Sequence, residues 1–178
     1  MIRLWLNQCR SSAALREVRR VGLDIACDDT GKLGKFAAAT SRLENLGNPD
    51  GTVMLERFGD KGAQWFRIRI SNPTCRNAMT GSMLVAFGQA LVDVAIVNQK
   101  QPVQALVIEG SHDAFCAGSH LELLQAATAD DRAVMCDFMQ FVTTLNTMQR
   151  YPTITLADGP AIGGGAELFL VSPMNESL

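Results

Sequence analysis

The stretch Thr153-Ile-Thr-Leu-Ala-Asp-Gly-Pro-Ala-Ile-Gly-Gly-Gly-Ala-Glu-Leu168 decides the fold of this chain. It predicts a short apolar strand, a turn through three consecutive glycines, and an apolar helix with an acidic residue in its first turn. A glycine turn of this kind can direct backbone N–H groups at a developing negative charge, because no side chain stands in the way. A similar succession occurs upstream, where the apolar run of residues 105–108 precedes Phe115-Cys-Ala-Gly-Ser-His-Leu121.

Composition limits the class of protein. The chain has 178 residues and a formal net charge of -2, so we expect one core and no basic footprint for nucleic acid. No run approaches the roughly 18 uninterrupted apolar residues of a membrane span. The cysteines are odd in number and lack a CxxC pair, which argues against a disulfide framework or a zinc knuckle and favours a reducing compartment. They are Cys9, Cys27, Cys75, Cys116 and Cys136.

The first 50 residues differ from the rest. Residues 1–22 contain five arginines and one acidic residue, Glu17, a composition typical of a mitochondrial transit peptide. The alternatives are a basic terminus without function and a mispredicted start. Residues 23–50 are mildly acidic, so we interpret residues 1–50 as a leader followed by a partly helical arm, and residues 51–178 as the domain.

From residue 51 the pattern becomes regular. Residues 51–58 and 63–70 predict a β-hairpin with one buried face, and a long amphipathic helix follows, with Thr80 as its N-cap. A second long helix is predicted by apolar residues at helical spacing, and Pro152 separates it from the last strand, Thr153–Ala157. The residues that mark this second helix are Val134, Phe138, Phe141, Leu145 and Met148.

The two glycine turns each place backbone amides at the start of a helix. Unpaired N–H groups and the positive end of the helix dipole favour an anion there. Two such turns that converge on one oxygen would form an oxyanion hole, in which losing one donor typically costs about a hundredfold or more in rate. The alternative is that the glycines serve only tight packing.

Three motifs in order resemble the crotonase, or enoyl-CoA hydratase/isomerase, superfamily over about residues 51–170. They are the two glycine turns quoted above and the upstream Asn72-Pro-Thr-Cys-Arg-Asn-Ala-Met79. The resemblance implies an α/β fold, the ClpP/crotonase ββα superhelix, of which this chain would hold the N-terminal portion. Within the superfamily, the chain is most similar to the ethylmalonyl-CoA decarboxylases, on three features. These are Gly118-Ser119, Met139-Gln140 with Leu145, and Gly-Gly-Gly-Ala-Glu-Leu168.

The resemblance implies a catalytic role for three residues. The N–H groups of Ser119 and Gly164 would hold the thioester oxygen, and Glu167 would act as general acid or base, or else merely cap its helix. The implied groove for substrate and coenzyme A is lined by Arg76, Asn77, Ala78, Gly118, Ser119, His120, Leu121, Glu122, Gly163 and Gly164. Arg76 would lie near phosphate or would simply be solvated. No cofactor is implied beyond the coenzyme A that forms part of the substrate.

The implied function is that of a cytosolic lyase of fatty acid metabolism that decarboxylates ethylmalonyl-CoA or methylmalonyl-CoA. The alternatives are an enoyl-CoA hydratase/isomerase and an inactive truncated fragment that at most binds acyl-CoA or a full-length subunit. The family continues beyond Leu168 with further strands and helices, so we expect this chain to be truncated. A homotrimer or hexamer is expected for the full-length family, with no nucleic acid or membrane as partner.

Other interpretations of the motifs fail on their residues. A phosphate loop would need Lys-Ser/Thr where Gly165-Ala166 stands, and no GxGxxG occurs. A metal site of His112, Cys116 and His120 is disfavoured because the turn at Gly118 breaks any helix that would align them. Cys116 has no base placed beside it by sequence. His120 replaces the Asp usual in the family's motif, and it would either relay a proton or be an ordinary loop histidine.

Overall fold

The computed structural model describes residues 42–43, 51–60, 62–147, 149–172 and 174–177. The basic segment of residues 1–22 therefore lies outside the described residues, and so does the predicted arm apart from Arg42 and Leu43. Leu43 is fully buried, and Arg42 forms an ion pair with Asp131. This part of the arm thus packs against the domain.

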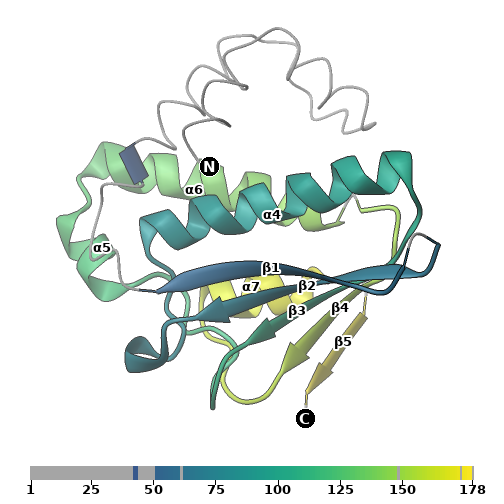
Figure 1. Ribbon diagram of the computed structural model, residues 1–178. Helices are drawn as coiled ribbons and strands as arrows, with labels where there is room; N and C mark the ends of the chain where they lie inside the picture. Colours follow the sequence, from purple (N-terminus) through teal and green to yellow (C-terminus); the bar gives the residue numbers. More distant parts are fainter. Residues whose placement is uncertain (1–41, 44–50, 61, 148, 173, 178) are drawn as a thin grey trace, which may run out of the picture.

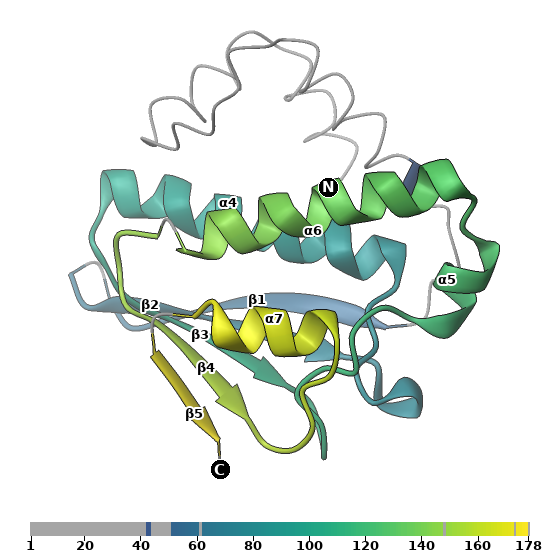
Figure 2. The same cartoon turned by 180° about the vertical axis from the view of Figure 1, so that it is seen from behind.

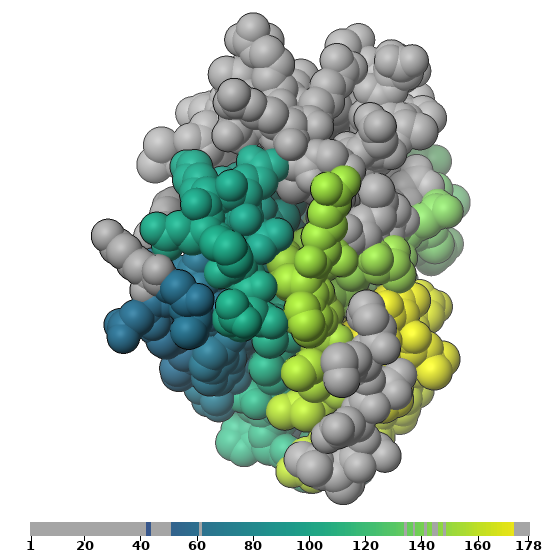
Figure 3. Space-filling view, turned by 90° about the vertical axis from the view of Figure 1, so that its right-hand side faces the viewer, coloured from purple at the N-terminus to yellow at the C-terminus, as the bar shows by residue number. Residues whose placement is uncertain are grey.

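One mixed sheet forms the base of the molecule (Figure 1). Its strands are β1 (Thr52–Phe58), β2 (Gln64–Ser71), β3 (Val103–Gly110), β4 (Thr153–Ala157) and β5 (Met174–Ser177), and they lie in this order across the sheet. The β1–β2 pair is antiparallel, which confirms the predicted hairpin, and the other three pairs are parallel. Figure 3 shows the same progression from the hairpin toward α7 (Gly164–Leu170) in side view.

The prediction that β4 is the last strand is wrong, because β5 follows it. The sequence of β5, Met-Asn-Glu-Ser, lacks the apolar run by which a strand is recognised. It is held instead by pairing along the open edge of β4, with Met174 opposite Ile154. Long-range pairing of this kind leaves no local signal in the sequence.

Helices cover one face of the sheet (Figures 1 and 2). The two long ones are α4 (Gly81–Lys100) and α6 (Ala129–Thr147), which contact each other; α7 and the short α5 (Leu121–Ala126) complete the set. A 3-10 turn, Pro73–Cys75, links the hairpin to α4. The predicted N-cap is confirmed, because Thr80 Oγ1 accepts a hydrogen bond from Met83 N at 3.3 Å.

Strand β2 explains why the sheet has two different faces. Its residues alternate between buried and half-buried, so Phe66, Ile68 and Ile70 point into the core while Arg67 and Arg69 point outward. The outward guanidinium groups lie between two acidic residues on the flanking strands. Arg67 Nε is 3.0 Å from Glu56, and Arg69 Nε is 2.7 Å from Glu109.

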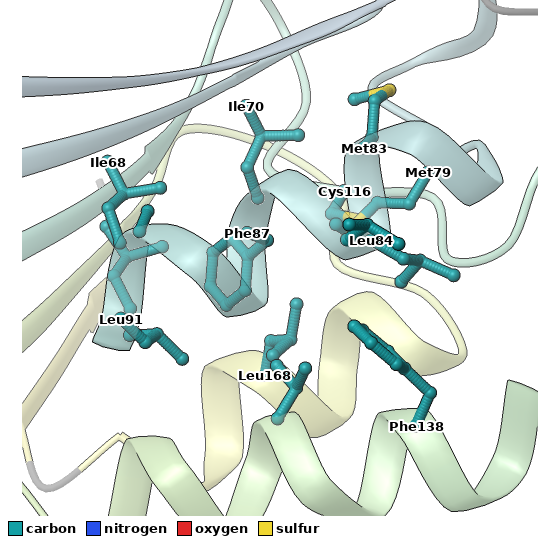
Figure 4. Packing of buried hydrophobic residues seen from close by; sticks show 14 of the residues in the cluster. Ile68, Ile70, Met79, Met83, Leu84, Phe87, Leu91, Cys116, Phe138 and Leu168 are labelled. Carbon is teal, nitrogen blue, oxygen red and sulfur yellow. The ribbon is translucent and has the colours of Figure 1, made fainter. Parts of the chain in front are cut away.

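The core lies between the sheet and the helices. Figure 4 shows Phe87 of α4, Phe138 of α6 and Leu168 of α7 pointing toward one another beneath β2. Each is at most 2% exposed, and burying a side chain of this size contributes about 1.5 to 3 kcal/mol. By length and composition α4 would suffice to cross a membrane, but 61% of its apolar window is buried in this core.

Candidate functional site

Most of the predicted site residues lie on three segments that run side by side, and Leu121, Glu122 and Glu167 lie in the helices that follow two of them. We call residues 76–80 the entry segment, residues 115–120 the first turn and residues 160–165 the second turn. Isolated parallel bridges join the entry segment to the first turn, at Met79 and Ser119, and the first turn to the second, at Cys116 and Ala161. The first turn is therefore held between the other two.

Backbone hydrogen bonds fix the first turn against the entry segment. Met79 N donates to Gly118 O at 2.7 Å, and His120 N donates to Met79 O at 2.9 Å. These bonds are made by the residues on either side of Ser119. Because successive N–H groups of an extended chain point in opposite directions, the Ser119 N–H points away from the entry segment.

The second turn approaches the first so closely that two glycines are required. A Cβ on Gly118 would lie 2.8 Å from Ile162 O and 3.3 Å from Gly164 N, and Gly118 also has a φ of +85°. A Cβ on Gly165 would overlap the Cys116 carbonyl oxygen. Ile162 N donates to Cys116 O at 2.9 Å and holds the two turns together.

The geometry brings the two predicted donors to neighbouring positions. Gly164 is the first residue of α7, where no intrahelical acceptor exists for its N–H. Within the described part of the chain, neither the Ser119 N–H nor the Gly164 N–H donates to another residue. Both residues are partly exposed. The site thus presents two available N–H groups on turns that touch each other.

Asn77 is the structural centre of the entry segment. Its Nδ2 donates to Ser111 O at 2.6 Å and to Ala114 O at 2.7 Å, and its Oδ1 accepts from Asn72 N at 2.8 Å. The residue is fully buried and has a φ of +57°. Its side chain therefore holds the loops in position, and the predicted place of Asn77 in the groove stays a prediction. Ala78 is buried as well.

The other predicted residues are more accessible. Arg76, Leu121, Glu122, Gly163 and Glu167 are all exposed. Arg76 forms no ion pair with any described residue, and its carbonyl accepts from Ala117 N at 3.0 Å. Glu167 lies in the first turn of α7, three residues after Gly164. Arg76 and Glu167 therefore carry charges that solvent or a ligand can reach.

The structure shows one contact at the site that sequence reasoning missed. His120 caps α5, with its Nδ1 accepting from Glu122 N at 3.3 Å, and its Nε2 is 3.1 Å from Cys75 Sγ. The prediction considered each of these residues without the other, because they are far apart in the chain. By contrast, Cys116 is fully buried, and its burial raises the pKa of the thiol to about 11.

Met139 of α6 also reaches the site. Its terminal methyl group would lie 3.4 Å from a Cβ on Gly164. A separate open hollow of about 680 Å³ lies where the loops after β3 and β4 meet. It is lined by Pro73, His112, Asp113, Asp158 and Gly159, and none of the predicted site residues contributes to it. Among the described residues, no group of three His, Cys, Asp or Glu side chains is arranged to hold a metal ion.

The family model for enoyl-CoA hydratase/isomerase matches residues 61–174, which is more than half of the chain. The chain belongs to the enoyl-CoA hydratase/isomerase family. The match includes the entry segment and both turns, so the three motifs that suggested the resemblance all lie inside it. The crotonase resemblance drawn from the sequence is thereby confirmed.

Curated proteins similar to this chain include several that are named ethylmalonyl-CoA decarboxylase. The chain is 36% identical over 121 residues to an ethylmalonyl-CoA decarboxylase of Xenopus laevis, covering 66% of this chain and 38% of that protein. It is 35% identical over 131 residues to the enzyme of that name from Danio rerio, covering 71% of this chain and 41% of that protein. The chain thus spans about two fifths of the length of these relatives.

Solved structures of the family confirm the fold. An enoyl-CoA hydratase from Bacillus anthracis superposes with a TM-score of 0.62 at 17% identity, over 70% of this chain and 46% of that one. An enoyl-CoA hydratase from Thermoplasma volcanium gives a TM-score of 0.58 at 26% identity, over 70% of this chain and 47% of that one. The α/β crotonase fold predicted from the sequence is therefore observed.

Proposed function

We propose that this chain binds an acyl-CoA thioester and that the N–H groups of Ser119 and Gly164 donate hydrogen bonds to the thioester oxygen. The observation that carries the proposal is the contact of the two turns, which sets Gly118 against Gly164 N, while neither the Ser119 N–H nor the Gly164 N–H has an acceptor among the described residues. Preorganised donors of this kind stabilise an oxyanion because they need no reorganisation as charge develops.

The reaction we propose is decarboxylation of a 2-carboxyacyl thioester such as ethylmalonyl-CoA or methylmalonyl-CoA. The bond from Cα to the carboxylate breaks, CO2 leaves, and the electron pair moves to the thioester oxygen as an enolate. Two N–H donors lower the barrier because they stabilise this oxygen more strongly in the transition state than in the substrate. The decarboxylase names of the curated relatives support this choice of reaction.

A proton must then reach Cα, and we assign its transfer to Glu167. This carboxyl group lies in the first turn of α7, on the same helix as the Gly164 donor, and is exposed to solvent from which it can be reprotonated. Arg76 is an exposed cation on the entry segment and suits the phosphates of coenzyme A. In this scheme coenzyme A enters as part of the substrate, and no further cofactor is needed.

The test removes the Gly164 donor and nothing else on the backbone. Gly164→Pro lacks the N–H, yet proline suits the first position of a helix. Gly164→Ala is the matched control, because it keeps the N–H and its Cβ makes ordinary contact with Met139. We expect the proline variant to lose about 10²- to 10³-fold in CO2 release from ethylmalonyl-CoA and the alanine variant to stay close to the unsubstituted chain.

A binding measurement separates recognition from turnover. Calorimetric titration would compare butyryl-CoA with the thioether S-butyl-CoA, which lacks the carbonyl oxygen. We expect the unsubstituted chain to prefer the thioester and the Gly164→Pro variant to lose that preference. Equal binding of the two ligands would refute the oxyanion site. Hydration of crotonyl-CoA without CO2 release from ethylmalonyl-CoA would show that the chain is a hydratase and refute the proposed decarboxylation. Thioester binding without any turnover would refute the proposed catalysis and leave the proposed binding standing.

A further inference from the structure

Cys75 and His120 form a thiol–imidazole pair between two elements of the fold. Cys75 ends the 3-10 turn Pro73–Cys75, His120 begins α5, and Cys75 Sγ is 3.1 Å from His120 Nε2. Cys75 is half-buried, so a small reagent can reach its sulfur, whereas His120 is only 7% exposed. The imidazole ring is therefore fixed while the thiol beside it stays accessible.

Hydrogen bonding decides which nitrogen of the imidazole carries the proton. His120 Nδ1 accepts from Glu122 N at 3.3 Å, so the neutral ring must hold its proton on Nε2, the nitrogen that faces Cys75. The backbone of His120 is also fixed, because its N–H donates to Met79 O at 2.9 Å. A thiol, an imidazole whose N–H faces the sulfur, and a backbone N–H that orients the imidazole are thus in contact.

We propose that Cys75 is a site of thiol–disulfide exchange with low-molecular-weight disulfides and that His120 promotes the exchange. The Cys75 thiol loses its proton to solvent, and the resulting thiolate attacks one sulfur of the disulfide, forming a new S–S bond as the original one breaks. The other sulfur leaves as a thiolate and takes a proton from solvent. The Nε2–H of His120 donates to the Cys75 sulfur while that sulfur carries the negative charge, which is the form that attacks.

The chain supplies its own controls for this reaction. The described residues include three free cysteines, Cys75, Cys116 and Cys136, and Cys136 on α6 is exposed. Cys116 is fully buried, and burial raises the pKa of its thiol to about 11. The expected order of reaction is therefore Cys75 first, then Cys136, with Cys116 unreactive in the folded protein. Exchange at Cys75 requires no acyl-CoA, so this inference stands apart from the proposed function.

The experiment treats the full chain with excess 4,4′-dithiodipyridine and locates each modified cysteine by peptide mass mapping over time. We expect Cys75 to react about tenfold faster than Cys136. His120→Asn keeps a side-chain oxygen that can cap α5, because Asn is a favoured N-cap, but it lacks the imidazole N–H. In that variant we expect the Cys75 rate to fall about tenfold while the Cys136 rate is unchanged.

Two results would overturn the proposal. One is a Cys75 rate no greater than that of Cys136 in the unsubstituted chain, and the other is an unchanged Cys75 rate in a folded His120→Asn variant. Circular dichroism checks that this variant is folded. Should it fail to fold, Cys75→Ser decides in a chain that also carries Cys9→Ser and Cys27→Ser. There it must abolish the fast phase of thiopyridone release, and a fast phase that survives refutes the proposal.

Discussion

The contact between the two turns can be tested by adding one methyl group at Gly165. A Cβ there would overlap the carbonyl oxygen of Cys116 and would lie 2.8 Å from its carbonyl carbon. Carbon atoms in contact sit about 3.5 to 4.0 Å apart, so the turns would have to separate by roughly 0.7 Å or more. The obstacle is backbone, which cannot rotate away as the end of a side chain can.

The cost follows from this separation. Alanine in place of glycine would by itself favour α7 by up to about 1 kcal/mol, whereas an unrelieved overlap in a packed interior typically costs about 1 to 3 kcal/mol. The same movement weakens the hydrogen bond from Ile162 N to Cys116 O and shifts Gly164 relative to Ser119. A displacement of about 1 Å at a site can cost about a hundredfold in rate.

Gly164→Ala is the matched comparison for Gly165→Ala, because it makes the same chemical change one residue earlier. Its Cβ would meet only the flexible end of Met139, at 3.4 Å. Urea unfolding should therefore show Gly165→Ala to be less stable than the unsubstituted chain and Gly164→Ala to be equally stable or more so. Equal stability of the two variants would refute the close approach of the turns.

Three further outcomes follow from single residues. Asn77→Ala leaves several buried partners unsatisfied and should lower the free energy of unfolding by about 2 to 4 kcal/mol in urea titrations. The pKa of Cys116 rises from its ordinary 9.0 to about 11 in the folded protein, so the unfolded thiol ionises first as pH rises. Ionisation of the Cys116 thiol should therefore lower the free energy of unfolding by about 2 kcal/mol between pH 9 and pH 11. Cys116→Ala should lack this part of the decline and keep the part due to Tyr151, whose pKa burial also raises. Thr128→Ala removes the hydroxyl that receives a hydrogen bond from Asp131 N, and it should cost about 1 kcal/mol in the same assay. Hydrogen bonds from Thr128 are also the main cause that lowers the pKa of Asp131, so the stabilisation from this pair should be lost as pH falls below the usual Asp range, and a pH series of unfolding curves should show it.

Much of the fold could be predicted from local patterns. The alternation of β2 and the helical spacing of α4 each repeat over several turns or pleats, and Thr80 marks the start of α4 by its side-chain chemistry. Each of these signals lies within a short stretch of the chain, so it can be read from the sequence without knowing which segments pack together. Strand β5 carries no such signal, because its four residues are a strand only through their pairing with β4.

The sequence predicts the two turns of the site, but it does not predict the side-chain contacts between them and the entry segment. Gly118 and Gly164 stand out in the sequence because each belongs to a turn that needs glycine. The contact of Cys75 with His120 and the internal role of Asn77 depend on which segments lie side by side. A motif shows that the entry segment matters, but only the pairing of Met79 with Ser119 shows which side chains it brings to the first turn.

The three consecutive glycines of the second turn serve three separate requirements. Gly163 has a φ of +55° and open space around it, so it is needed for its backbone conformation and not for room. Gly165 is needed for room, because it packs against the Cys116 carbonyl. Gly164 lies between them and is strictly needed for neither, since a Cβ there would meet only a flexible methyl group. What distinguishes Gly164 is its N–H, which its two neighbours hold beside the first turn. The fold therefore depends on the outer two glycines and the proposed chemistry on the middle one, so substitutions at 164 can separate catalysis from stability where substitutions at 163 and 165 cannot.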